Sequence, residues 1–287
     1  MADSGTKDFG KILSDGLYRI PDYQRGYAWS SDEVNDLLDD LEYVTNNDHV
    51  TDHYLNSIIV TEIEGGTLTD AVHIIDGQQR LLTANLLANE ILRVAWQLVA
   101  ESNEDSDLEH LRGQIDRKLT TDVFRRGATD AQWRVLPAKE HQSIFKEIVP
   151  KDLLSDHTAD RDLSKIRKGV KDNDSTPSEE KLVEAAETIN RRLYDLLSSR
   201  DADTLQEKLI YLDRLAKTLH EDFTATLHEV DSASEAGRIF EAINDRGRSL
   251  NTADKVKSYL VYRATLGDLS IDVTTIHETF TTIYEIL

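Results

Sequence analysis

The chain has 287 residues, of which 39% are hydrophobic and 30% charged, and its formal net charge is −21. This length suits one large domain or two smaller ones. No apolar run approaches the roughly 20 residues that cross a bilayer, and the start lacks the apolar segment of a signal peptide. We therefore expect a soluble, cytoplasmic protein with no membrane partner. The absence of cysteine excludes disulfides, thiolate nucleophiles and cysteine-based zinc sites.

The excess of acidic residues has two interpretations. Contacts with phosphate need Lys and Arg, so a charge of −21 argues against a nucleic-acid partner. Acidic surfaces also keep proteins hydrated and soluble, as in halophilic organisms. The acids are spread over many predicted helical faces and are not gathered in one tail. We favour the halophilic interpretation, under which the net charge says little about the partner.

The first hundred residues predict an alternation of extended and helical segments. Residues 18–29, YRIPDYQRGYAW, are irregular because Pro21 forbids a helix through them. Ser30 and Glu33 then form a capping box for a helix that continues to about Val44. The remaining predicted elements are strands over His53–Ile63 and Val72–Asp76 and a helix from about Gln78 towards Val99.

After an acidic stretch the chain is predicted to be mainly helical. The segment WRVLPAKEHQSIFKEIV predicts a short extended piece and then a helix from Ala138. Residues 156–175 are polar and predict a loop or mobile linker. Thr176 and Glu179 supply the cap and the capping-box acid of the next helix. The last predicted elements are helices over 178–198 and 202–220, a strand over Phe223–Val230, a helix ending near Asn244 and a helical region from about Thr252.

The strongest local signal is the strand–helix junction Asp76-Gly77-Gln78-Gln79-Arg80. A helix N-terminus presents unpaired N–H groups and a partial positive charge, which suits phosphate. Arg80 can add a bidentate contact to phosphate oxygens, and Asp76 can hold Mg²⁺ or orient water. The alternative is a plain turn between strand and helix, with Asp76 as the cap and Arg80 on the surface. No P-loop motif occurs in the chain.

Two further clusters combine residue types that bind nucleotides. In the first, Tyr23, Gln24 and Arg25 are interleaved with Tyr27 and Trp29, which suits a base or a DNA backbone. The alternative is an aromatic plug over the core, with Arg25 paired to an acid. We expect this cluster and the junction at Asp76 to share one cleft at the edge of a small mixed sheet.

The second cluster lies near the predicted helix end, where Asn244 and Arg246 precede a glycine-containing turn. Its alternative is a helix C-cap, with arginine favourable at the negative end of the helix dipole. A weaker candidate is the stretch 161–171, RDLSKIRKGVK, the most basic part of this acidic chain. It is suited either to a nucleic-acid contact or to a solvated linker face.

Four motifs follow one another along the chain: IPDYQRGYAW, HYLNSIIV, IIDGQQRLLTANLL and IFEAINDRGRSLNTADKVKSYL. Taken in this order, they resemble the N-terminal domain of GmrSD-type restriction proteins, with SspE- and BrxU-like relatives. The resemblance runs from about Tyr18 to Tyr262. It implies an α+β fold, in which a small mixed sheet core of ParB/sulfiredoxin-like type covers 1–100. A mainly helical region over 101–287 would contain the returning strand 223–230 and the INDRG motif. Without cysteine, only the fold of sulfiredoxin would be shared, and its thiol chemistry is excluded.

The resemblance also implies binding and hydrolysis of nucleoside triphosphates, with DGQQR as the signature. On this basis the catalytic candidates are Asp76, Gln78 and Gln79, with Asp76 also expected to hold Mg²⁺. The nucleotide-binding candidates are Gly77, Gln79, Arg80, Tyr23, Gln24, Arg25, Asn244 and Arg246. The segment from Tyr23 to Arg25 is expected to handle nucleotide or to sense modified DNA.

The expected partners follow from the same resemblance. Relatives usually carry a second, HNH-type nuclease domain, but this sequence contains no HNH pattern. We therefore expect DNA cleavage to belong to another domain or subunit that this module regulates. The alternative function is a non-catalytic module that binds nucleotide or modified DNA and gates the nuclease. Steady-state phosphate release distinguishes the two.

Overall fold

The computed structural model describes most of the first 230 residues. The described residues are 4–22, 24–62, 71–100, 105–126, 131–151, 162–172, 175–199 and 204–230, together with 260, 275, 276, 279 and 280. Among the candidate residues, Tyr23, Asn244 and Arg246 lie outside this set, as does most of the chain after 230.

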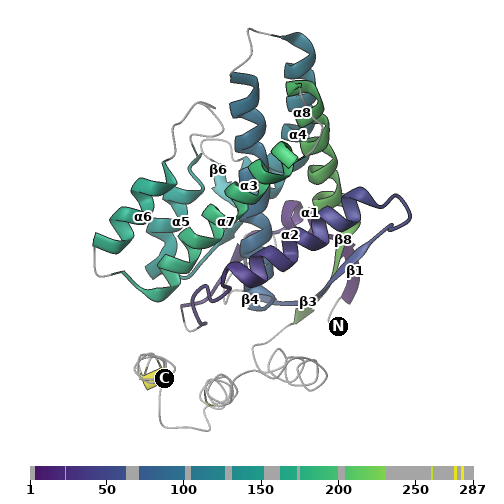
Figure 1. The fold of residues 1–287 in the computed structure, drawn as a ribbon. Coiled ribbons are helices and arrows are strands. Elements are labelled where there is room, and N and C mark those ends of the chain that lie inside the picture. The colour runs from purple at the N-terminus through teal and green to yellow at the C-terminus, as the bar shows by residue number, and fades with distance from the viewer. Residues whose placement is uncertain are drawn as a thin grey trace.

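A mixed six-stranded sheet forms one layer of the molecule (Figure 1). Its strand order is β1-β8-β3-β4-β2-β7. β8 pairs antiparallel with β1 and parallel with β3, β3 pairs antiparallel with β4, and β2 lies parallel between β4 and β7. The strands are β1 (Ser4–Asp8), β2 (Tyr18–Arg19), β3 (His53–Glu62), β4 (Val72–Asp76), β7 (Val135–Leu136) and β8 (Phe223–Val230). A separate antiparallel pair consists of β5 (Phe124–Arg126) and β6 (Ala131–Trp133).

Helices make up the rest of the described core, and α3 lies at their centre. The helices are α1 (Phe9–Asp15), α2 (Ser31–Asn46), α3 (Gln78–Ala100), α4 (Ser106–Val123), α5 (Gln142–Ile148), α6 (Leu163–Asp172), α7 (Pro177–Ser199) and α8 (Leu205–Lys217), with the short turns η1 (Lys139–His141) and η3 (Thr218–Asp222). α3 is buried along nearly its whole length and packs against α4, α7 and α8. Its sequence is rich in Leu, Ala, Ile and Val, as expected for a helix enclosed by other elements, and its buried polar residues include Asn85, Asn89 and Glu90. Figure 1 shows it running through the middle of the helical part.

The α+β architecture predicted from the sequence is confirmed. The capping box of Ser30 and Glu33 is present, with Ser30 N–H donating to Glu33 at 2.8 Å. Thr176 and Glu179 exchange the same kind of hydrogen bonds at the start of α7. The strands β4 and β8 have their predicted bounds. Apolar residues predominate in β4 and alternate with polar residues in β8, and both strands lie between polar turns.

One prediction about the helical region is wrong. Residues 156–175 were expected to form a loop, yet Leu163–Asp172 form α6. The segment has few apolar residues, but Leu163, Ile166 and Val170 lie on one face and pack against the core. This narrow apolar stripe is sufficient to form the helix because α5 and α7 provide a surface against which it packs.

The sheet combines strands from both sides of residue 100. β7 and β8 pair with strands of the first hundred residues, so one hydrophobic core contains both parts. The division into 1–100 and 101–287 therefore stays a prediction. Among the described residues, we find no helix that combines the length and the apolar character needed to span a membrane.

Candidate functional site

The turn from β4 into α3 requires glycine at position 77. Gly77 has a φ of +90°, a region that L-residues rarely adopt. A Cβ atom there would lie 2.9 Å from Cγ1 and 3.3 Å from Cα of Ile58, the neighbouring residue in β3. The turn brings the first N–H groups of the 23-residue helix α3 to the end of β4. These groups have no partner within the helix and carry its partial positive charge.

The guanidinium of Arg80 folds back over this turn. Its Nη2 donates to the carbonyl oxygen of Ser57 at 2.7 Å and to Oδ2 of Asp76 at 3.4 Å. Nη1 and Nε of Arg80 have no hydrogen-bond partner within the described part of the chain. The side chain is 19% exposed, so the alternative of a surface arginine does not describe it. One edge of the guanidinium is anchored, and the other can accept a ligand.

The carbonyl that anchors Arg80 comes from an irregularity in β3 that the sequence analysis missed. The register with β8 shifts between Tyr54 and Ser57. Within the shift, Asn56 has a φ of 78°, and its Oδ1 accepts a hydrogen bond from Ser57 N–H at 2.9 Å. Asparagine is depleted in strands but tolerates this conformation. Asn56 within HYLNSIIV was therefore the available signal.

Asp76 lies in a partly buried position close to two positive charges. Burial raises the pKa of its carboxyl above the ordinary value, and the charges of Arg80 and Arg25 act in the opposite direction. A hydrogen bond from the Gly77 N–H also stabilises the ionised form. The carboxylate therefore belongs to a compact cluster of one acid and two arginines.

The segment 24–29 is tied to this junction, as predicted for Gln24 and Arg25. Gln24 Nε2 donates to Ile75 O at 3.3 Å, and Gln78 Nε2 donates to Arg25 O at 3.2 Å. The expected position at a sheet edge is wrong in one respect. The contacts lie at the carboxyl ends of β2 and β4, and neither is an outer strand of the sheet. Parallel pairing of these two strands brings the loops after them together.

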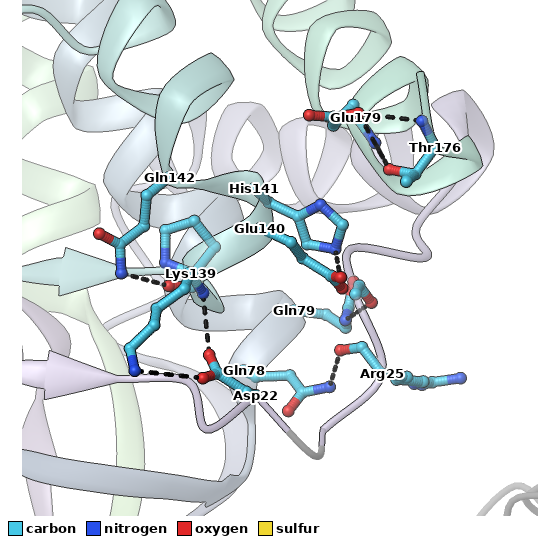
Figure 2. Close-up of polar contacts among 12 residues, drawn as sticks. Asp22, Arg25, Gln78, Gln79, Lys139, Glu140, His141, Gln142, Thr176 and Glu179 are labelled. Carbon is cyan, nitrogen blue, oxygen red and sulfur yellow. Dashed lines mark hydrogen bonds and ion pairs between the residues drawn. The ribbon is translucent and has the colours of Figure 1, made fainter. Parts of the chain in front are cut away.

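The two glutamines of the motif have different surroundings (Figure 2). The amide of Gln79 is engaged at both ends, since Nε2 donates to Gly26 O at 3.2 Å and Oε1 accepts from Ala28 N at 2.8 Å. Gln78 is also only 6% exposed, yet its Oε1 has no hydrogen-bond partner among the described residues. Gln79 therefore holds the loop, whereas Gln78 retains an acceptor for a ligand.

Tyr27 belongs to the core, which supports the aromatic-plug alternative at this position. Its side chain is 3% exposed, and its hydroxyl lies 2.7 Å from Thr83 Oγ1. Thr83 in turn donates to Gln79 O at 2.8 Å, so the tyrosine is the donor to Thr83. Trp29 is partly buried against the same core. Both aromatics pack the loop against the core, and the buried ring of Tyr27 is not available to stack on a base.

A second helix N-terminus contacts the same loop. A Cβ at Gly26 would lie 2.3 Å from Ser178 Oγ and 2.6 Å from His141 Nε2, so the loop packs directly on the start of α7 and on η1. Lys181 Nζ donates to Ala28 O at 3.0 Å. His141 is 3% exposed and pairs through Nε2 with Glu140 at 3.0 Å; Figure 2 shows this pair beside Gln79. Glu140, His141 and Lys181 were not among the predicted site residues, although the first two lie in the segment WRVLPAKEHQSIFKEIV.

The described residues offer no preformed metal site. They contain no group of three His, Asp or Glu side chains that could hold a metal ion. Asp76 is one carboxylate beside a helix N-terminus. Mg²⁺ bound together with a nucleotide commonly uses one or two protein carboxylates and completes its shell with phosphate oxygens and water. Asp76 could therefore supply one ligand to an ion whose other ligands come from a bound molecule and water.

The fold and this junction define an α+β domain. Its candidate site lies where the turn between β4 and α3 contacts the loop 24–29 and the start of α7. The model of the family described as GmrSD restriction endonuclease, N-terminal domain, matches residues 9–261. The chain belongs to this family and is therefore part of a restriction system, with DNA as the indicated target and a nuclease domain as the indicated partner. A search among curated proteins found no match.

Proposed function

We propose that this chain binds and hydrolyses a nucleoside triphosphate and thereby regulates the nuclease of its restriction system. The observation that carries the proposal is the buried Oε1 of Gln78 at the N-terminus of α3, which has no hydrogen-bond partner among the described residues. A buried acceptor without a partner costs about 1–3 kcal/mol, which a ligand with a suitably placed donor recovers. The neighbouring helix terminus and Arg80 suit the phosphates of such a ligand.

Each residue of the junction has a distinct role in this proposal. The free edge of Arg80 and the N–H groups of the first turn bind phosphate oxygens, and Gly77 lets the backbone approach them. Asp76 would hold Mg²⁺, which supplies neutralisation of phosphate charge when it is bound. Gln78 accepts a hydrogen bond from the attacking water or from the nucleotide. Gln79, whose amide is fully engaged, positions the loop that carries Gln24 and Arg25.

The test measures nucleotide affinity and phosphate release in two variants. Arg80→Ala should lower affinity at least about tenfold, because breaking a buried arginine–phosphate pair costs about 2–5 kcal/mol. Asp76→Asn should retain binding and lose turnover. Arg112→Ala is the matched control, since this arginine is also mostly buried and ion-paired, but on α4. Unchanged affinity in a folded Arg80→Ala variant would contradict the phosphate site.

A second function is favoured by the engagement of Gln79. With this amide committed to the loop, one of the two candidate water-positioning groups is occupied. The same residues of the junction would then bind nucleotide or modified DNA without turnover and gate the nuclease. Nucleotide binding without steady-state phosphate release supports this second function.

A further inference from the structure

Helix α6 is strongly cationic in a strongly acidic chain. Its ten residues contain Lys165, Arg167, Lys168 and Lys171 against the single acid Asp172. The whole chain has 54 acidic and 33 basic residues, and α2 has acidic residues without any Lys or Arg. A local cluster of positive charge is therefore unusual in this molecule.

Three of these cations form a ridge on the outer face of α6. Lys165, Lys168 and Lys171 are spaced three residues apart and are exposed, whereas the apolar face packs on the core. Over six residues the ridge rises about 9 Å along the helix axis. We name these three residues the α6 lysine ridge.

Few acids of the described part of the chain pair with the α6 lysine ridge. Within the described residues, Lys168 and Lys171 form no ion pair, and Lys165 lies 3.5 Å from Asp162 in an exposed pair. Arg167, which is not part of the ridge, pairs with Glu187 and so ties α6 to α7. The helix is held in place while its lysines remain available to a partner.

The ridge is connected to the candidate site through α7. α6 packs on α7, and the first turns of α7 contact the loop 24–29 through Ser178 and Lys181. Figure 1 shows the end of α6 and the start of α7 at the same end of the molecule as this loop. Helix α7 therefore links the cationic helix α6 to the loop of the candidate site.

We propose that the α6 lysine ridge binds the phosphate backbone of duplex DNA. Evenly spaced lysines suit a regular row of phosphates, and such contacts position a protein without regard to base sequence. The proposal deepens the proposed function by giving its DNA partner a surface. It does not depend on nucleotide hydrolysis.

The test is titration of the full chain with a labelled, unmodified DNA duplex over a series of KCl concentrations. The triple variant Lys165→Gln/Lys168→Gln/Lys171→Gln should bind about tenfold or more weakly at low salt. The slope of log affinity against log salt should become smaller by about 1 for each lysine that contacts phosphate. The matched control, Lys11→Gln/Lys208→Gln/Lys217→Gln, changes net charge equally and should retain the wild-type slope.

Three outcomes would overturn the proposal: no DNA binding by the folded wild type at low salt, an unchanged slope in the ridge variant, or an equal loss in the control. Nucleotide affinity, measured on the same ridge variant, should equal that of the wild type. Failure of nucleotide binding in wild type would contradict the proposed function, while the DNA titration would still test the ridge.

Discussion

Two adjacent glutamines are both buried, but only one has its amide fully paired. Replacing Gln79 by leucine removes the partners of Gly26 O and Ala28 N–H and should cost about 1–3 kcal/mol in the free energy of unfolding. Gln78→Leu removes an unpartnered oxygen together with one hydrogen bond, so stability should change by about 1 kcal/mol or less while nucleotide affinity falls. Urea unfolding and nucleotide titration of both variants check this contrast. Equal destabilisation by the two substitutions would contradict it.

Asp122 and partly buried His220 form an ion pair that is not part of the candidate site. His220 Nδ1 lies 2.8 Å from Oδ2 of Asp122, which is fully buried. Burial raises the pKa of Asp122 to about 6, and the hydrogen bond to Asp122 raises the pKa of His220. Both pKa values are higher in the folded state than in the unfolded state. Each group therefore stabilises the folded state at low pH, and this stabilisation is lost as the pH rises. The loss occurs between about pH 4 and 6 for Asp122 and above about pH 6.5 for His220.

The pH prediction uses Asp122→Asn, which cannot ionise. From pH 5 to pH 8, the unfolding free energy of wild type should fall relative to that of the variant by about 1–2 kcal/mol. Urea unfolding at four pH values in this range measures the difference. A difference that stays constant or rises with pH would show that the pair does not titrate in this sense.

At the scale of elements, the junction between β4 and α3 depends on one backbone conformation. Gly77→Ala should destabilise the protein by at least about 1–2 kcal/mol, because the left-handed backbone is unfavourable for alanine and its Cβ would contact Ile58. Gly113→Ala is the control: Gly113 lies inside α4, and the nearest atom to an added Cβ is 3.7 Å away. This control should gain up to about 1 kcal/mol. Chemical denaturation measures the free energy of unfolding of both variants. An unchanged free energy in Gly77→Ala would refute the requirement for glycine in this turn.

At the scale of the whole molecule, net charge opposes folding. The 54 acidic residues repel one another in the compact state, and α2 has acidic residues on its solvent face with no Lys or Arg. Raising KCl from 0.1 to 1 M shortens the Debye length from about 10 Å to about 3 Å. The melting temperature should rise, by about 2–4 °C for each kcal/mol gained. A sucrose series separates screening from general exclusion, and a melting temperature that falls with KCl would contradict the prediction.

Much of the fold could be predicted because its signals are local. Apolar periodicity gave α2, α3, α7 and α8, and capping boxes located the starts of α2 and α7. β1 and β2 could not be predicted, since one has the polar sequence SGTKD and the other has two residues. Both exist because they pair with strands distant in sequence, β1 with β8, and β2 with β4 and β7.

The sequence alone determined the family of the chain and the junction at which its polar residues gather, because residue order and helix signals are local properties. Only the tertiary structure decided which of those residues are engaged. Parallel pairing of β2 with β4 brings the loop 24–29 against α3. Gln79 therefore binds that loop, while Oε1 of Gln78 has no partner among the residues that the structure describes. The bulge in β3 likewise supplies the carbonyl that anchors Arg80. Contacts of this kind depend on the relative placement of distant segments, which no local pattern encodes.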